Sequence, residues 1–352
     1  MKIPSIPGIL TVEQVRQTGA AIAGMQEPDG ALPWFPGGKT DPWDHVESAM
    51  ALSASGYLNP ARAAYEWSAH NQRDDGSWPM EIRQGRIVDT GVDSNFCAYI
   101  AVGVWHHYLI SDDDAFLWSM WPTVRAALDR VLLFQRPDGA FRWAADYVTG
   151  AMFDAALITG NASIYSSLVC GLKIAARVDD ESARRAVVEW ERARADLAGA
   201  FAVPAESFLP PSEHSMDWYY PVLGGVLRGE AGRVALDAEW DRFVVSGLGV
   251  RCVSHRPWVT GAETSELAIA LAAIGDADRA AAMVASIQHL RDPDGSYWTG
   301  LVFSDGKRWP VERSCWTSAA VILAADAISR STPAGGIFAD LGGAAVPAQF
   351  PS

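Results

Sequence analysis

The sequence predicts an all-α protein, an (α/α)6 toroid made of two concentric rings of helices. Two observations lead to this prediction: a short turn motif recurs along the chain, and segments with helical periodicity come in pairs. The second segment of each pair is the more apolar, and a helix that is apolar on all sides needs protein around it. We therefore expect six outer helices with charged stripes around six inner ones.

The turn motif is a glutamine followed by an Asp-Gly pair and one or more aromatic residues. Copies begin at Gln26, Gln72 and Gln135, and a looser copy begins at Gln288. Each copy falls where an apolar helical stretch ends. There the glycine can adopt the left-handed conformation that stops a helix, while the aspartate accepts hydrogen bonds from nearby amides. The motif therefore predicts a chain of repeated helix–turn units.

The predicted helices alternate between outer and inner positions. In chain order the pairs are 11–25 with 43–56, 59–72 with 93–109, 113–135 with 161–178, 181–200 with 217–228, 231–246 with 262–275, and 276–291 with 312–329. We expect residues 1–330 to form one toroid domain and residues 331–352 to pack on it as an irregular tail. Most outer-to-inner connections are long, so the inner helices should all begin at one mouth of the toroid.

Charge and hydropathy limit the classes of partner. The net charge is −14 and no run of Lys or Arg occurs, which argues against nucleic acid and anionic membrane surfaces as partners. No apolar segment reaches the length of a signal peptide or a membrane span, so we expect a cytoplasmic protein. The four cysteines are scattered, without the close spacing of a zinc or redox motif.

Acidic and aromatic residues gather at the predicted starts of the inner helices. Helix capping accounts for many of the acids, but it does not account for the Trp, Tyr and His residues beside them. Carboxylates between aromatic walls suit either acid catalysis on an electron-rich hydrocarbon or hydrolysis of a sugar. The candidate catalytic residues are Asp93, Asp217, Asp44 and Glu263. The candidate substrate-binding residues are Trp43, His45, Glu47, Asp89, Asn95, Tyr165, Trp218, Tyr219, Tyr220, Trp258, Glu266, Glu312, Arg313 and Trp316.

The repeated Gln, Asp-Gly and Trp pattern resembles the QW motifs of the squalene and terpenoid cyclase and protein prenyltransferase superfamily, whose members fold as α/α barrels. The resemblance implies a cyclase-like or prenyltransferase-like enzyme with a prenyl substrate, and this is the main expectation. In such an enzyme Asp93 or Asp217 would act as general acid. Aromatic π faces would stabilise cationic character, and Arg313 would hold a diphosphate.

The same resemblance bears on metals and cofactors. Prenyltransferases of this superfamily hold a zinc ion with Asp, Cys and His. Asp93 and Cys97 are similar to part of that set, but no His completes it. We therefore predict no bound metal and no cofactor, with Mg²⁺ needed only if the substrate is a diphosphate.

A second resemblance gives an alternative. The stretches Trp105–Phe141 and Gly160–Tyr165 look like the hairpins of glucoamylase-type six-hairpin glycosidases. Such enzymes use two carboxylates roughly 6.5 to 9.5 Å apart for inversion, and the four candidate catalytic residues named above can supply the pair. A third alternative is a toroid that binds a lipid or glycan without catalysis, in which the acids serve only as helix caps. The expected partner is thus a small prenyl or sugar molecule.

Overall fold

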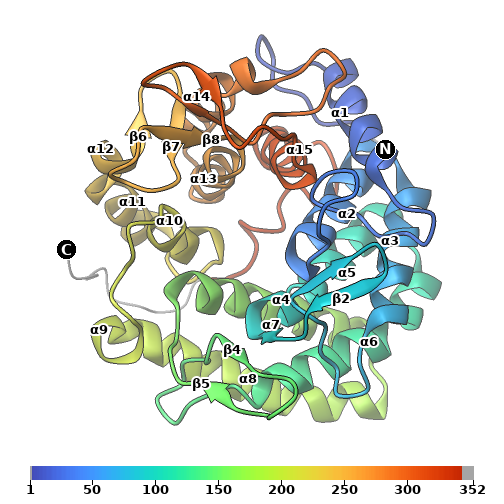
Figure 1. Cartoon of the computed structure of the whole chain (residues 1–352). Helices are drawn as coiled ribbons and strands as arrows, with labels where there is room; N and C mark the ends of the chain where they lie inside the picture. Colours follow the sequence, from blue (N-terminus) through green and yellow to red (C-terminus); the bar gives the residue numbers. More distant parts are fainter. Residues whose placement is uncertain (1, 343–352) are drawn as a thin grey trace.

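Two rings of helices make up the part of the chain that the computed structural model describes, residues 2–342 (Figure 1). The outer helices in this range are α1 (Val12–Met25), α3 (Leu58–Asn71), α6 (Asp114–Leu132), α8 (Glu181–Ala202), α11 (Gly229–Ala238) and α14 (Ala277–Ser286). The inner helices are α2 (Pro42–Ser55), α4 with α5 (Ser94–Ala98, Ile100–Ser111), α7 (Ile158–Val178), α10 (Met216–Leu223), α13 (Gly261–Ala273) and α15 (Cys315–Ser329). Each inner helix contacts the next, and α15 contacts α2, so the inner ring is closed. The predicted (α/α)6 toroid is confirmed.

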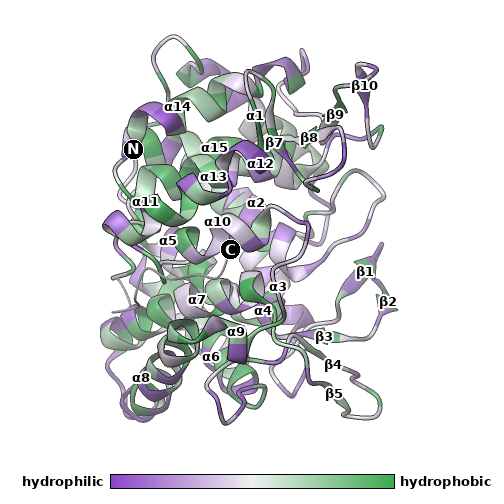
Figure 2. Ribbon diagram, turned by 90° about the vertical axis from the view of Figure 1, so that its left-hand side faces the viewer, coloured by the Kyte–Doolittle hydropathy of each residue, from purple (hydrophilic) through white to green (hydrophobic). Residues whose placement is uncertain are grey.

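The connections from outer to inner helices contain short antiparallel strands that the sequence did not predict. One hairpin pairs β1 (Glu81–Arg83) with β2 (Arg86–Asp89), and a three-stranded sheet joins β3 (Val92–Asp93), β4 (Ala144–Ala145) and β5 (Met152–Phe153). A five-stranded sheet contains β6 (Val244–Val245), β7 (Gly249–Arg251), β8 (Trp258–Thr260), β9 (Gly300–Val302) and β10 (Lys307–Arg308). These strands lie on one side of the helices (Figure 2). Strands this short cannot display the alternation by which a strand is recognised.

Two predicted helices in the third quarter of the chain are longer than the observed ones. The inner helix expected over 217–228 ends at Leu223, because Gly224 and Gly225 follow and Gly225 adopts a φ of 88°. The outer helix expected over 231–246 ends at Ala238. Two short helices lie beside this region, α9 (Pro204–Ser207) and α12 (Trp240–Phe243), and strand β6 follows α12. Near the end of the chain, α14 is followed by a 3-10 turn, η1 (Gln288–Leu290).

The repeated turn motif joins neighbouring outer helices. In the second copy, the Gln72 side-chain amide donates to the carbonyl oxygens of Gly76 (2.9 Å) and Thr123 (3.0 Å), and Thr123 belongs to the next outer helix. Gly76 adopts a φ of 85° and approaches the same helix so closely that a Cβ would lie 2.2 Å from the Ala126 oxygen. Gln26 and Gln135 make the corresponding pairs of bonds, to Gly30 with Pro60 and to Gly139 with Ala193. These three copies therefore join α1, α3, α6 and α8 into one continuous part of the outer ring.

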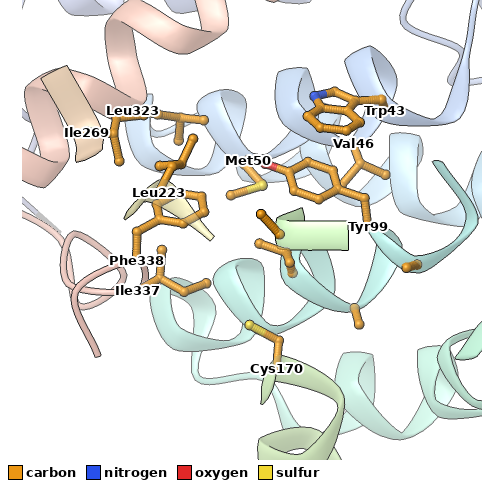
Figure 3. Close-up of a cluster of buried hydrophobic side chains, with 14 of the residues drawn as sticks. Trp43, Val46, Met50, Tyr99, Cys170, Leu223, Ile269, Leu323, Ile337 and Phe338 are labelled. Atoms are coloured by element: carbon orange, nitrogen blue, oxygen red, sulfur yellow. The ribbon is translucent and has the colours of Figure 1, made fainter. Parts of the chain in front are cut away.

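The interior of the barrel is filled with apolar side chains from the inner helices (Figure 3). Met50, Leu223, Ile269 and Leu323 are buried, and Ile337 and Phe338 join them from the turns that follow α15. Trp43 and Tyr99 belong to the same buried cluster and begin the aromatic part of the interior. Of the predicted tail, residues 343–352 lie outside the described residues, and the division into toroid and tail remains a prediction. Among residues 2–342, no helix combines the length and apolar character that crossing a membrane requires.

Candidate active site

A cavity of about 290 Å³ opens at the N-terminal ends of the inner helices α2, α4 and α7. Its aromatic wall consists of Trp34, Trp43, Phe96, Trp143 and Trp316. Its polar and charged lining consists of Lys39, Asp41, Asp44, Asp93, Ser94, Asn95, Thr159 and Asn161. An apolar wall with a few converging polar groups is typical of a small-molecule site.

Two aspartates at the start of α2 form the most acidic corner of the cavity. Asp41 caps the helix by accepting a hydrogen bond from the Asp44 amide (2.9 Å), and its other oxygen lies 3.1 Å from Lys39 Nζ. Burial, together with the charge of Asp41 beside it, raises the pKa of Asp44 well above its ordinary range. Burial therefore favours the protonated form of Asp44, the form that can donate a proton to a ligand.

A third carboxylate, Asp93, caps α4 on the neighbouring part of the cavity wall. One of its oxygens accepts hydrogen bonds from the amides of Asn95 (2.8 Å) and Phe96 (3.0 Å). Burial nevertheless raises the pKa of Asp93 to about 7. The side-chain oxygen of Asn95 is buried and has no partner among the described residues, so it is free to accept a hydrogen bond from a ligand hydroxyl.

Beneath the cavity, two further carboxyl groups are held by aromatic side chains. Trp43 donates its indole N–H to Glu47 (3.1 Å) and stacks on Tyr99 with ring centroids 5.1 Å apart. Glu266 accepts hydrogen bonds from the hydroxyls of Tyr219 and Tyr220, the latter at 3.0 Å. Burial raises the pKa of Glu47 to about 8 and that of Glu266 well above its ordinary range. This layer fixes the Trp43 ring from below.

Helices α2 and α13 carry the same arrangement of carboxyl groups. Asp44 and Glu263 are the third residues of their helices, and Glu47 and Glu266 are the sixth. Both helices pack on α15, and Glu47 lies near enough to Glu266 to raise its pKa. Glu263 is only 4% exposed, and one of its carboxylate oxygens has no hydrogen-bond partner among the described residues. Two carboxyl groups at equivalent helical positions thus lie on either side of α15.

Several predicted binding residues lie in the core, away from the cavity. The buried His45 ring accepts a hydrogen bond from the Leu32 amide (3.1 Å) and donates to the Ala64 carbonyl (2.8 Å), and burial lowers its pKa to about 4. Tyr165 is buried with its hydroxyl 3.2 Å from an Arg194 nitrogen. Trp218 stacks on Phe243 with centroids 5.3 Å apart. These three side chains are buried against other protein groups and do not belong to the cavity lining.

Other predicted residues lie at the rim. Asp217 accepts hydrogen bonds from the Thr159 hydroxyl (2.6 Å) and the Ser212 amide (2.8 Å), and Asp89 is exposed at the end of strand β2. Trp258 donates to the Trp309 carbonyl (2.7 Å).

Glu312 and Arg313 form contacts near the first and last repeats. Glu312 accepts a hydrogen bond from the Trp34 indole (2.7 Å). Arg313 forms ion pairs with Asp292 (2.5 Å) and Asp294 (2.8 Å), and both partners belong to the fourth copy of the turn motif. Its charge is therefore used within the protein, not held toward the cavity.

Sequence reasoning missed several cavity residues, and some of them carried a signal. Asp41 directly precedes Pro42, which is the pattern of a helix cap followed by proline at the first helical position. Trp143 ends the third copy of the turn motif. Lys39 and Met216 lie in loops or at a helix start with no local pattern, so only the closed ring brings them to the cavity.

Comparison with known proteins decides the family. The chain is 56% identical over 336 residues to the MMP endo-(1,4)-3-O-methyl-alpha-D-mannosidase of Mycolicibacterium hassiacum, a match that covers 96% of this chain and 92% of the relative. The chain belongs to the family of this mannosidase. A scan against protein-family models finds no match.

Solved structures agree with the fold. A wild-type glycosidase superposes with a TM-score of 0.69 at 16% identity, covering 90% of this chain and 96% of that one. A D-mannose isomerase superposes with a TM-score of 0.67 at 10% identity, covering 91% and 98%. A rhamnosidase from Klebsiella oxytoca with rhamnose bound gives 0.64 at 13% identity, covering 92% and 65%. At these identities the likeness establishes the toroid only.

The expectation of a terpenoid cyclase or prenyltransferase acting on a prenyl substrate is wrong, because the 56% identical relative is a mannosidase. The resemblance to six-hairpin glycosidases is the one supported. The QW-like repeat misled because its glutamine and glycine join outer helices and contribute no catalytic group. In residues 2–342, no cluster of three His, Cys, Asp or Glu side chains can hold a metal ion. The absence of a cofactor and the cytoplasmic location remain predictions.

Proposed function

We propose that this protein is an endo-acting glycoside hydrolase that cleaves 1,4 linkages between 3-O-methyl-α-mannose units. The observation that carries the proposal is the 56% identity, over 96% of this chain, to a relative with that activity in its name. The cavity supports it, because carboxyl groups lie between aromatic side chains on which sugar rings can stack.

We assign the acid and base to Asp44 and Glu263. Burial beside Asp41 favours the protonated form of Asp44, which would protonate the glycosidic oxygen as the bond to the anomeric carbon breaks. Glu263 has a carboxylate oxygen without a hydrogen-bond partner within residues 2–342, and it would accept a proton from the water whose oxygen bonds to the anomeric carbon. The proton lost by Asp44 and the one gained by Glu263 balance the hydrolysis.

The surrounding groups support this assignment. The charge of Asp41 beside Asp44 favours the protonated form of Asp44, while the charge of Lys39, 3.1 Å from Asp41, opposes it. Trp43 is fixed by its hydrogen bond to Glu47 and its stack on Tyr99, so its ring offers a rigid platform for a sugar. The side-chain oxygen of Asn95, which has no partner in the described part of the chain, suits a sugar hydroxyl.

Asp93 is the second candidate for the base, because it lines the cavity together with Asp44, whereas Glu263 is not among the lining residues, and because its pKa is about 7. Its two backbone hydrogen bonds suit a helix cap equally well. Comparing kcat of Asp93→Asn with that of Glu263→Gln distinguishes the two. If Asp93→Asn loses activity and Glu263→Gln keeps it, Asp93 replaces Glu263 in the pair.

The activity itself is tested by incubating the purified protein with 1,4-linked 3-O-methylmannose oligosaccharides, with unmethylated 1,4-linked mannose oligosaccharides of equal length, and with prenyl diphosphates plus Mg²⁺. We expect mass spectrometry to detect fragments from internal cleavage of the methylated chains. Release of single sugars from one end alone, or no cleavage of any sugar chain, would reject the proposal.

A further inference from the structure

The β4–β5 hairpin and the residues after it expose an unusual number of large apolar side chains at the mouth. We call this surface the apolar shelf and define it as Trp143, Tyr147, Val148, Met152, Phe153 and Leu157. Val148 is 79% exposed and Phe153 is 49% exposed. Exposed apolar residues elsewhere include single positions on outer helices, such as Val188 on α8 and Val234 on α11. Contiguous apolar patches on a protein surface mark binding sites, whereas scattered single residues do not.

The shelf is continuous with the cavity. Trp143 and Leu157 line the cavity, and the Phe153 ring lies beside Trp143 with centroids 5.6 Å apart. The strand register makes the same connection, since Phe153 is opposite Ala144 and Ala144 is opposite Asp93. A ligand that extends out of the cavity on this side therefore meets the shelf.

Polar contacts hold the shelf in place. The Arg73 guanidinium lies 3.7 Å from the centre of the Tyr147 ring and donates to the Thr90 carbonyl (3.1 Å), which ties the hairpin to the segment before β3. Asp146 accepts hydrogen bonds from the amide (2.7 Å) and hydroxyl (2.9 Å) of Thr149 and so closes the turn. A surface held in this way loses little conformational freedom when a ligand binds.

We propose that the apolar shelf binds the methyl-ether-bearing sugar units next to the unit held in the cavity, and that it makes the enzyme prefer methylated to unmethylated chains. This inference rests on the proposed hydrolase function. A methyl ether replaces a hydroxyl donor with an apolar group, so an apolar surface gains from methylation and loses no hydrogen bond to it. Burial of one methyl group corresponds to about a fourfold gain in affinity. Two or three methylated units on the shelf would give a preference of roughly tenfold or more.

The test compares Met152→Ser/Phe153→Ser with the wild type, and Val188→Ser, an exposed valine on α8, serves as the control. Calorimetry measures affinity for methylated and unmethylated 1,4-linked mannose oligosaccharides of equal length. Kinetics measure kcat and KM on the methylated oligosaccharide and on a short aryl mannoside that fits the cavity alone. We expect the double variant to lose about tenfold in affinity for the methylated chain, through KM and not kcat. Its affinity for the unmethylated chain and its turnover of the short substrate should be unchanged, and Val188→Ser should match the wild type throughout.

Three results would overturn the inference: equal affinity of the double variant and the wild type for the methylated chain, equal losses for both chains, or no binding of either chain to the wild type. Sedimentation can give a fourth contradicting result. If the wild type is a dimer and the double variant is a monomer, a second copy of the chain covers the shelf. If the wild type binds methylated chains on the shelf but cleaves none, the hydrolase proposal fails and the binding preference stands.

Discussion

Replacing Asp93 by asparagine should change how stability depends on pH. Burial raises the pKa of Asp93 from 3.8 to about 7, so the folded protein holds a proton there that the unfolded chain has already released at pH 5 to 6. Stability from this group is therefore fully present below the unfolded pKa and is lost as pH rises toward 7. Asparagine keeps an oxygen that can cap α4, accepting the Asn95 and Phe96 amides, but it cannot titrate.

The size of the effect follows from the shift. Each pKa unit corresponds to about 1.4 kcal/mol, so the interval from about pH 5.5 to about pH 7 gives roughly 2 kcal/mol. Asp93 is in contact with the open cavity, and solvent screening reduces this to about 1 kcal/mol. The free energy of unfolding is measured by urea denaturation at about pH 5.5 and about pH 8. From about pH 5.5 to about pH 8, we expect the free energy of unfolding of Asp93→Asn to rise by about 1 kcal/mol relative to that of the wild type.

The exposed Asp89→Asn serves as the control and should follow the wild type at both pH values. If the difference between Asp93→Asn and the wild type stays constant with pH, the Asp93 carboxyl is not desolvated. The description of the cavity as a site that raises carboxyl pKa values would then be wrong for this residue.

Two further substitutions test structural roles. Gly76→Ala places a Cβ 2.2 Å from the Ala126 oxygen at a φ of 85°, so it should lower the free energy of unfolding by about 3 kcal/mol or more. The control Gly150→Ala has a φ of 72° and no described atom within 4 Å of the new Cβ, and it should lower the free energy of unfolding by about 1 kcal/mol. Equal losses for the two variants in urea denaturation would refute the tight joint between outer helices. His45→Ala breaks the hydrogen bonds to Leu32 and Ala64, so it should lower the free energy of unfolding by about 2 to 4 kcal/mol and leave kcat per folded molecule unchanged. A selective rise in KM would show instead that His45 contributes to substrate binding.

The fold could be predicted from the sequence because the toroid is made of local signals. The Asp-Gly turns mark where outer helices end, and the all-apolar run around Leu267 marks an inner helix, so each unit is readable by itself. The same signals misled about function. The glutamine of the first three repeats and the glycine of all four serve the joint between outer helices, a need that toroids of different chemistry share.

The candidate site could be predicted only in part. Asp44 and Glu263 each lie in the first turn of a helix, where capping alone favours acids, so sequence cannot separate a catalytic carboxyl from a cap. Their relation depends on the order of helices in the ring, in which α15 lies between α2 and α13 although it comes last in the chain. Lys39 and Trp143 reach the cavity from loops whose course depends on short strands.

The most direct test of the account is the rate at which Asp44→Asn and Glu263→Gln hydrolyse a 1,4-linked 3-O-methylmannose oligosaccharide. Asparagine resembles the protonated Asp44 in shape but cannot donate the proton, and glutamine cannot accept one from water. We predict that each variant lowers kcat by about 10² to 10⁴-fold while its thermal midpoint stays near that of the wild type. Wild-type turnover by either folded variant would contradict the assignment of that residue to the catalytic pair.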